Sequence, residues 1–261
     1  MTRLIEPEWL DELPPDDPDA VRSRRDLCRV NAWMGHHGLM AGALRHCCRN
    51  RPPAHIVELG AGDGDFLLRV AQRLATLTLP PHSRPGQRDG NPALGRVNAE
   101  IRTGSVWDGL RVTLLDRQSI VPLQTLTSFA ALGLPAERVR ADVFHWTQAV
   151  GALDVVVANL FLHHFHEPSL AGLFRALAAR AQLFIALEPR RGALPWVASR
   201  LLWAIGCNLV TQHDARMSVQ AGFDGDELSR LWPADSGWQL TERRAGAFSH
   251  FFAAQKLRPL A

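Results

Sequence analysis

The chain has 261 residues, 46% of them hydrophobic, and a formal net charge of +3 at pH 7. This length predicts one α/β domain with a modest cap, built around a sizeable hydrophobic core. The small net charge argues against a nucleic-acid-binding protein, because such proteins present a strong positive field.

The cysteines and the N-terminal residues indicate the class and location of the protein. The four cysteines include no C-x-x-C pair, so we expect neither a metal site nor a disulfide framework. Residues 1–19 are acidic and rich in proline, unlike a signal peptide, and predict a loose leader over the surface. No apolar run approaches ~18 residues, so we expect no membrane span and a cytoplasmic protein.

Residues 1–52 are predicted to form this leader and an N-terminal helical cap, separate from a domain at 53–261. A helical apolar pattern starts at Asp19, is interrupted near residues 33–38, and then continues until the prolines at 52–53 end it. The break contains a tryptophan, a methionine and paired histidines. These residues either line the mouth of a substrate site or pack the cap onto the sheet: Trp33, Met34, His36 and His37.

The nonapeptide 58–66 joins a short apolar run to a segment with helical periodicity. This predicts a strand at 54–59, a glycine-rich turn and a helix at 64–78. The glycines let the backbone turn tightly and let a ligand approach closely. The spacing differs from G-x-G-x-x-G, and Glu58 and Asp63 would repel the pyrophosphate of a dinucleotide. Acids here suit a ligand that carries an amino group and a positive centre.

This turn resembles motif I, E/D-x-G-x-G-x-G, of the class I methyltransferases that use S-adenosylmethionine (SAM). The resemblance implies a Rossmann-like fold with the SAM site at the turn. The residues that it assigns to the cofactor are Glu58, Gly60, Ala61, Gly62, Asp63, Gly64 and Phe66.

Residues 79–107 contain many prolines and glycines and show no clear periodicity. A connection of this length without elements of its own is unusual in a compact domain. We predict a flexible surface insertion, with a substrate lid as the alternative.

Acids also follow the next two predicted strands, at 110–115 and 137–141. A carboxylate after the second strand accepts both hydroxyls of an adenosine ribose, and NAD-binding folds use the same contact. The acid after the third strand is either an adenine ligand or a plain helix N-cap. The resemblance assigns four residues here to the cofactor: Asp116, Arg117, Asp142 and Val143.

A continuous apolar strand at 153–159 is predicted to be central and buried on both faces. It leads into the sequence L-H-H-F at 162–165, a pattern that resembles the ubiquinone- and menaquinone-methylating enzymes and their natural-product relatives. The D/N-P-P-Y/F sequence of enzymes that methylate nucleic-acid bases or protein glutamine is missing. The resemblance implies a small-molecule acceptor and adds Asn159 and Leu160 to the cofactor site.

The resemblance implies that the remaining elements complete an α/β, Rossmann-like, doubly wound sheet of seven strands in the order 3-2-1-4-5-7-6. Strand 7 is expected to run antiparallel, in a terminal hairpin that turns near Gly246. Open sheets place their sites beyond the carboxyl ends of strands, so Glu188 after strand 5 is expected at the pocket. Other predicted elements are helices at 119–132, 145–150, 167–179 and 224–232, an apolar segment at 194–205, a loop at 203–217, and strands at 181–188, 238–244 and 247–254.

Methyl transfer is an in-line displacement, so much of its catalysis is positioning. A hydroxyl acceptor also needs a general base, for which histidine suits neutral pH. The resemblance favours His163 as this base, with Phe165 as the aromatic neighbour found in plant-type O-methyltransferases. His164, His213 and the cap histidines are the alternatives. The candidate acceptor-binding residues are Trp33, Met34, His37, Phe161, Glu188, Trp203 and His213.

The predicted function is methyl transfer from SAM to a small aromatic or polyketide-like acceptor, at oxygen, without a metal. The product would be S-adenosylhomocysteine (SAH). N- or C-methylation of a small heteroaromatic metabolite remains an alternative, and so does a catalytically silent SAM- or SAH-binding partner protein. We expect no nucleic-acid partner, and a homodimer is left open.

Overall fold

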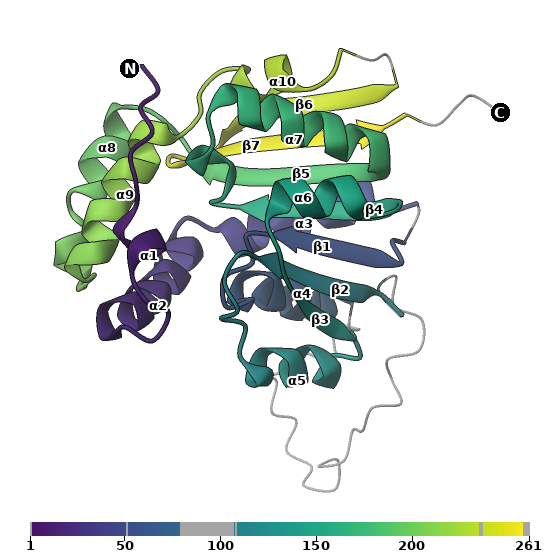
Figure 1. Cartoon of the computed structure of the whole chain (residues 1–261), viewed down its shortest axis with the longest axis horizontal. Coiled ribbons are helices and arrows are strands. Elements are labelled where there is room, and N and C mark those ends of the chain that lie inside the picture. The colour runs from purple at the N-terminus through teal and green to yellow at the C-terminus, as the bar shows by residue number, and fades with distance from the viewer. Residues whose placement is uncertain (1, 51, 79–106, 108, 235–236, 258–261) are drawn as a thin grey trace, which may run out of the picture.

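The computed structural model describes residues 2–50, 52–78, 107, 109–234 and 237–257. Its centre is a seven-stranded sheet in the order β3-β2-β1-β4-β5-β7-β6 (Figure 1). Strands β1 to β5 pair in parallel, and β7 lies antiparallel between β5 and β6. The predicted order and orientation are therefore confirmed. The strands are β1 His55–Leu59, β2 Arg111–Asp116, β3 Ala136–Arg140, β4 Leu153–Asn159, β5 Ala181–Pro189, β6 Trp238–Ala245 and β7 Ser249–Lys256.

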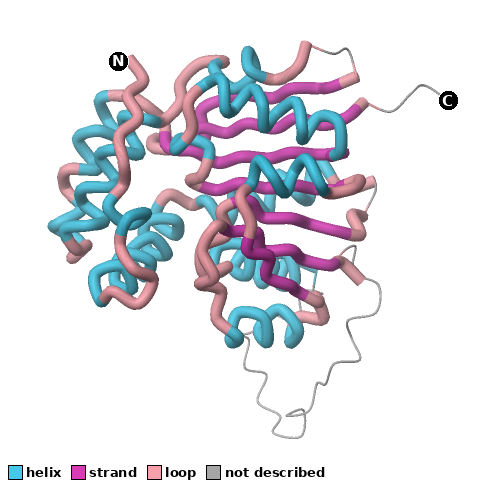
Figure 2. The backbone as a smooth tube through the Cα atoms, in the orientation of Figure 1, coloured by secondary structure: helices cyan, strands magenta, loops and turns pink. Residues whose placement is uncertain are grey.

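Helices cover both faces of the sheet, which explains why β4 and β5 are apolar along almost their whole length. Each face has its own hydrophobic core, and Figure 2 shows the sheet between the two helical layers. One layer consists of α3 (His36–Cys47), α4 (Asp65–Thr78) and α5 (Leu123–Ala131). The other consists of α6 (Val143–Ala149), α7 (Glu167–Arg180) and α10 (Glu227–Leu231).

A second group of helices lies beyond the carboxyl ends of the parallel strands (Figure 1, left). The predicted cap came from residues 1–52 alone, but α8 and α9 from the chain after β5 join it. The helices of this group are α1 (Trp9–Glu12), α2 (Pro18–Trp33), α8 (Ala193–Ser199) and α9 (Leu209–Ala221). The 3-10 turn η4 (Leu162–His164) follows β4 and contacts both α9 and β5, while η5 (Leu202–Ile205) joins α8 to α9 within the cap.

The loop predicted at 203–217 is wrong, because η5 and α9 occupy most of it. The side chain of Asn208 caps this helix by accepting the N–H of Thr211, at 2.9 Å. Buried Asp26 on α2 accepts the N–H of Asn208 at 2.8 Å and the hydroxyl of Thr211 at 3.3 Å. The buried side of α9 is therefore partly polar, so its helical period gives little hydrophobic signal in the sequence.

Smaller differences lie at the boundaries of other elements. The helix predicted at 119–132 begins only at Leu123, after Pro122. The apolar segment 194–205 divides into α8 and η5. The insertion predicted at 79–107 lies outside the described residues, apart from Trp107, which is buried. No helix in the described part of the chain combines the length and apolar character that crossing a membrane requires.

Candidate functional site

A cavity of about 710 Å³ lies between the cap and the carboxyl ends of β1, β2 and β4. The glycine turn after β1 and the acids after β2 and β3 line one end, which we call the donor end. The residues after β4 and the N-terminal leader line the other, which we call the acceptor end. The predicted cofactor residues on the cavity wall are Glu58, Gly60, Ala61, Gly62, Asp63, Phe66, Asp116, Arg117, Asp142, Val143, Asn159 and Leu160.

The glycine turn is built so that only some of its positions tolerate a side chain. Gly60 has φ +66°, and a Cβ there would lie 2.2 Å from the ring of Phe161. Gly62 has φ +56°, and a Cβ there would meet no atom within 4 Å. Gly60 is thus required by packing, while Gly62 faces open space in the cavity.

We expect Gly60→Ala to lower the free energy of unfolding by about 2–4 kcal/mol, since it combines left-handed backbone strain with overpacking against Phe161. Gly62→Ala is the matched control, because it carries the same backbone strain without the collision and should lose only about 1–2 kcal/mol. Urea unfolding of the two variants measures the difference. Equal losses of unfolding free energy in the two variants would show that the ring of Phe161 can move aside at no cost.

Glu58 is a buried carboxylate without a complete set of partners. Its side chain is 2% exposed, and its Oε2 has no hydrogen-bond partner among the described residues. Burial raises the pKa of Glu58 well above its usual value, and the charges of Asp63, Asp116 and Asp65 add to the effect. An uncompensated buried carboxylate is costly, so a positively charged group in the donor end would stabilise it. This fits the ammonium and sulfonium of SAM.

Asp116 organises the donor end through its two carboxylate oxygens. It accepts the N–H of Gly62 at 2.8 Å and the N–H of Gln118 at 2.7 Å. Asp142 is indeed the N-cap of α6 and accepts the N–H groups of Phe144 and His145. It also lines the cavity, so its two predicted roles are compatible.

Asn159 connects the end of β4 to the cap. Its side-chain carbonyl lies 2.6 Å from Nδ1 of His36, and its amide donates to Asn31 at 3.0 Å. The other ring nitrogen of His36 lies 2.7 Å from the hydroxyl of Ser249. Burial lowers the pKa of His36 to about 4, so this ring is neutral and structural. The next residue, Leu160, has φ +52°, an uncommon backbone for a leucine that places it on the cavity wall.

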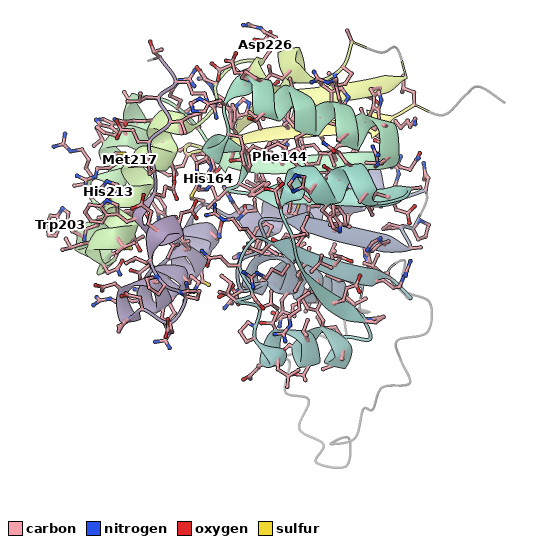
Figure 3. All side chains as sticks on the ribbon, in the orientation of Figure 1. Phe144, His164, Trp203, His213, Met217 and Asp226 are labelled. Carbon is pink, nitrogen blue, oxygen red and sulfur yellow. The ribbon has the colours of Figure 1, made fainter. Side chains whose placement is uncertain are left out.

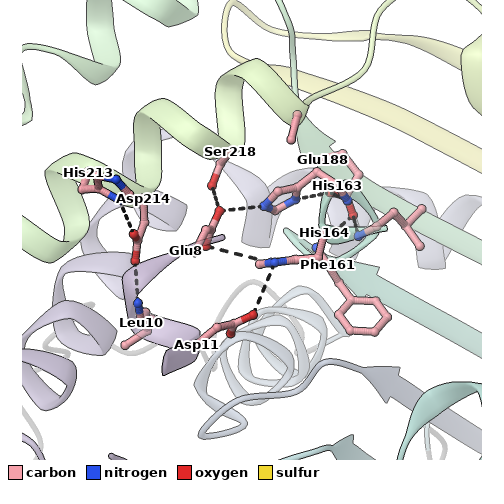
Figure 4. Close-up of polar contacts among 12 residues, drawn as sticks. Glu8, Leu10, Asp11, Phe161, His163, His164, Glu188, His213, Asp214 and Ser218 are labelled. Atoms are coloured by element: carbon pink, nitrogen blue, oxygen red, sulfur yellow. Dashed lines mark hydrogen bonds and ion pairs between the residues drawn. The ribbon is translucent and has the colours of Figure 1, made fainter. Parts of the chain in front are cut away.

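His163 lies between two carboxylates at the acceptor end (Figure 4). Its Nδ1 is 2.8 Å from Glu188, and its Nε2 is 3.2 Å from Glu8 of the leader. Burial lowers the pKa of His163, but its hydrogen bonds to Glu188 and Glu8 outweigh this and raise the pKa to about 9. For Glu8, burial acts to raise the pKa, but the hydrogen bond to His163 prevails and lowers it to about 2. The imidazolium is thus the stable form in this arrangement.

Because the pKa of His163 is raised from 6.5 to about 9 in the folded protein, its protonation stabilises the fold fully below about pH 6.5. This contribution is lost as the pH rises through about 9. We expect the thermal unfolding midpoint of the wild type to exceed that of His163→Gln most at pH 6.5, and the difference to shrink toward pH 9.5. His46→Gln, at an exposed position on α3, is the control. A difference that stays constant with pH would contradict the assignment.

His164 lies next to the same carboxylates and is less enclosed. Its Nε2 is 4.0 Å from Glu8 and its Nδ1 is 3.6 Å from Asp11. Burial, and then the charge of His163, lower the pKa of His164. One ligand atom each of Glu8, His163 and His164 lie within 4.8 Å of one another, a grouping that could hold a metal ion. In this arrangement, however, Nε2 of His163 is already engaged by Glu8.

The leader is anchored, so the loose arrangement predicted for residues 1–19 is wrong. The Arg3 guanidinium donates to the backbone carbonyls of Ala221, His163 and Phe165 at 2.7 to 3.1 Å. Asp214 on α9 accepts the N–H of Trp9 at 2.8 Å and that of Leu10 at 3.0 Å. The ring of Trp9 stacks on His213, with 3.9 Å between ring centroids.

Only two of the predicted acceptor-binding residues lie at the acceptor end. Phe161 lines the cavity, and Glu188 is buried behind His163. Trp33 and Trp203 are 58% and 63% exposed, and Figure 3 shows Trp203 and His213 on the side of α8 and α9, away from His164. The predicted residues that do not line this cavity are Trp33, Met34, His37, Trp203 and His213.

Glu8 and Ser218 are the residues of the acceptor end that the sequence did not indicate. The hydroxyl of Ser218 donates to Glu8, which holds the carboxylate against His163. Acids are common in a proline-rich leader, and a serine on a helix is unremarkable. No pattern in the sequence therefore distinguishes these two side chains from solvent-exposed ones.

Solved structures with the same fold include several methyltransferases. The Mitomycin 7-O-methyltransferase MmcR is 15% identical, with a TM-score of 0.54 over 95% of this chain and 60% of that chain. The plantazolicin methyltransferase BamL, in complex with a triazolic desmethylPZN analog and SAH, is 10% identical, with a TM-score of 0.60 over 95% and 93%. An O-methyltransferase family protein from Burkholderia thailandensis is 14% identical, with a TM-score of 0.53 over 93% and 61%.

A scan against protein-family models found no match, and a search of the curated proteins found none either. At identities of 10% to 15% the likeness concerns the fold. The chain has the Rossmann-like fold of the class I methyltransferases, and the resemblance is confirmed at that level. The alignment with this chain covers 60% of the length of MmcR and 93% of that of BamL.

Proposed function

We propose that the protein transfers a methyl group from SAM to a small acceptor, at an oxygen atom. The observation that carries this proposal is the single cavity that joins the acid-lined glycine turn to His163. It provides a donor end with a buried carboxylate, one oxygen of which has no partner among the described residues, and an acceptor end with a histidine–carboxylate pair. The fold shared with MmcR, an O-methyltransferase, and with BamL, which was crystallised with SAH, supports it.

At the donor end, the proposed roles follow from the side chains on the cavity wall. SAM, when bound, supplies a methyl group on a positively charged sulfur. Glu58 and Asp63 provide the negative charge that holds a cationic ligand. Asp116 has carboxylate oxygens suited to the ribose hydroxyls, and we assign the adenine to Asp142 and Val143, which line the same cavity.

At the acceptor end, we propose His163 as the general base. Glu188 accepts hydrogen bonds from the backbone N–H groups of Phe161 and Leu162, at 3.0 and 2.8 Å, so its position is well defined. Its contact with Nδ1 of His163 orients the ring, so that Nε2 is the atom that takes a proton. Removing the acceptor's proton generates the anionic nucleophile for in-line displacement.

We propose an aromatic acceptor, since aromatic side chains lie beside the reacting end. Phe161 and Phe165 both line the cavity, and their rings meet edge to face with centroids 5.0 Å apart. Such rings offer a planar acceptor both stacking and edge contacts. The polar groups beside them, His163 and His164, then orient its hydroxyl.

Two measurements test the function. Calorimetry should show SAH binding and no NAD binding, because the acid-lined turn disfavours a pyrophosphate. A SAM-dependent screen of phenolic and heteroaromatic compounds with mass detection should then show a product heavier by one methyl group. Binding of NAD in place of SAH would refute the donor assignment. SAH binding without turnover of any acceptor would instead support the silent binding protein.

A further inference from the structure

The proton-accepting atom of the proposed base already has an occupant in this structure. Nε2 of His163 faces the Glu8 carboxylate at 3.2 Å, in the part of the cavity where an acceptor hydroxyl would have to approach (Figure 4). Nε2 has one in-plane hydrogen-bonding direction, so it can pair with only one group at a time. An acceptor that uses His163 as its base must therefore take the place of Glu8.

The groups around the Glu8 carboxylate are hydrogen-bond donors. The hydroxyl of Ser218 donates to it, Nε2 of His163 donates in the imidazolium form, and Nε2 of His164 lies 4.0 Å away. Donors that converge on one position favour an oxygen that carries negative charge. An ammonium group or a neutral hydrocarbon at the same position would leave these donors without partners.

The leader that carries Glu8 is held mainly by polar contacts. None of the residues 2–19 is fully buried, and α1 has no buried residue. Leu4 and Trp9 remain 50% and 46% exposed. Segments with little buried apolar surface open at a small free-energy cost compared with global unfolding. The leader can thus leave while the sheet and α9 stay folded.

We infer that Glu8 is an internal occupant of the acceptor position, and that the acceptor binds as an oxyanion at Nε2 of His163 in place of the Glu8 carboxylate. This inference rests on the proposed function for the identity of the site. It specifies the acceptor as a compound with an acidic hydroxyl, such as a phenol, enol or carboxylic acid. It also makes Glu8 a specificity-determining residue, since a weakly acidic alcohol cannot replace a carboxylate there.

The reaction is balanced without a further reagent. When Glu8 leaves, His163 loses the pairing that holds its Nε2 proton and releases that proton to water. The neutral ring then takes the proton of the acceptor hydroxyl, and the resulting imidazolium pairs with the oxyanion. A bond forms between this oxygen and the methyl carbon as the carbon–sulfur bond breaks, and its electron pair stays on sulfur. The methylated product leaves, and Glu8 returns to the imidazolium, so that one proton is released to water in each cycle.

A chromophoric phenol tests the inference directly. With SAH present, 4-nitrophenol should bind to the wild type as the phenolate, seen by its absorption at a pH below the pKa of the free compound. Glu8→Ala should bind it roughly tenfold more tightly, because the internal competitor is removed. Asp16→Ala, which removes a carboxylate at an exposed leader position outside the cavity lining, should match the wild type. Nitrobenzene, which has no hydroxyl, should not distinguish the variants.

Weaker binding of 4-nitrophenol by Glu8→Ala would overturn the inference, because Glu8 would then assist the acceptor. Binding of the neutral phenol alone would overturn it as well. Calorimetry of SAH on the same variant separates this outcome from a failure of the proposed function. Unchanged SAH affinity with unchanged or weaker phenol binding rejects only the role of Glu8.

Hydrogen exchange provides a second measurement that does not depend on a substitution. The amides of Leu4, Trp9 and Leu10 are hydrogen-bonded to Gln220 and Asp214. Saturating 4-nitrophenol with SAH should raise the exchange of the leader peptide, and SAH alone should not. Peptides from β4 and β5 are the internal control. A leader that becomes more protected with the phenol would show that it closes over the acceptor, contrary to the inference.

Discussion

His163→Gln is expected to lower kcat by about 10²–10⁴, the range typical for loss of a general base. The Kd of SAH should stay within a factor of about two, because His163 lies at the acceptor end while the donor end is formed by the turn after β1. Glutamine keeps a polar side chain between Glu8 and Glu188, so the neighbouring carboxylates retain a donor. Single-turnover kinetics at saturating SAM measure the chemical step.

His164→Gln is the matched comparison for this variant. It changes the adjacent histidine, which also lines the cavity but is less buried. The ion pairs of His164 are with Glu8 and Asp11, not with Glu188. We expect a loss in kcat below about tenfold, since His164 contributes a polar contact and no proton transfer. If kcat falls further in His164→Gln than in His163→Gln, then His164 and not His163 is the general base. Near-normal turnover by His163→Gln would remove it as the base.

Asp116→Ala is expected to weaken SAH binding by about 10²–10³. The carboxylate fixes the turn through the N–H of Gly62, and the proposed contacts with the ribose hydroxyls are charge-assisted hydrogen bonds worth about 1.5–3 kcal/mol each. Asp116→Asn keeps one carbonyl acceptor, so it should bind with intermediate affinity. Calorimetric titration with SAH measures both variants.

Asp154→Ala is a matched control at the opposite end of the sheet. Asp154 also accepts two backbone N–H groups, those of Ala54 and His55, at 2.9 and 3.1 Å. It does not line the cavity. We expect this variant to lose stability without a change in SAH affinity. If Asp116→Ala and Asp154→Ala weaken SAH equally, the effect of Asp116 is general destabilisation and not contact with the ligand.

The donor end and the acceptor end differ in how well their residues could be predicted from the local sequence. The donor end was predicted well in position, because strand, turn and first helical residues are contiguous at 55–66 and the glycine pattern dictates the backbone. The acids Asp116 and Asp142 follow strands whose apolar runs are clear. Parallel neighbours bring their carboxyl ends together, so these residues share one cavity.

Most candidates for acceptor binding in the cap were predicted from their residue type, which does not locate a side chain. Trp33 stacks on Phe248 with 4.5 Å between ring centroids and stays largely exposed. His213 supports Trp9 of the leader. Exposed aromatic residues have the same composition as pocket residues, and only the packing of α2, α8 and α9 decides which way each one points.

By itself, the sequence determined the glycine turn and the acids that surround it, because each depends on residues near one another in the chain or on the fixed direction of parallel strands. The sheet order was predicted from the family resemblance that these residues carry, and the structure confirms it. The tertiary structure alone decided the acceptor end. There Glu8, His163 and Ser218 meet across separations of 155 and 210 residues. Contacts between residues so far apart in the chain form only when whole elements dock against one another. Single polar residues in a leader or on a helix have no periodic pattern from which such contacts could be predicted.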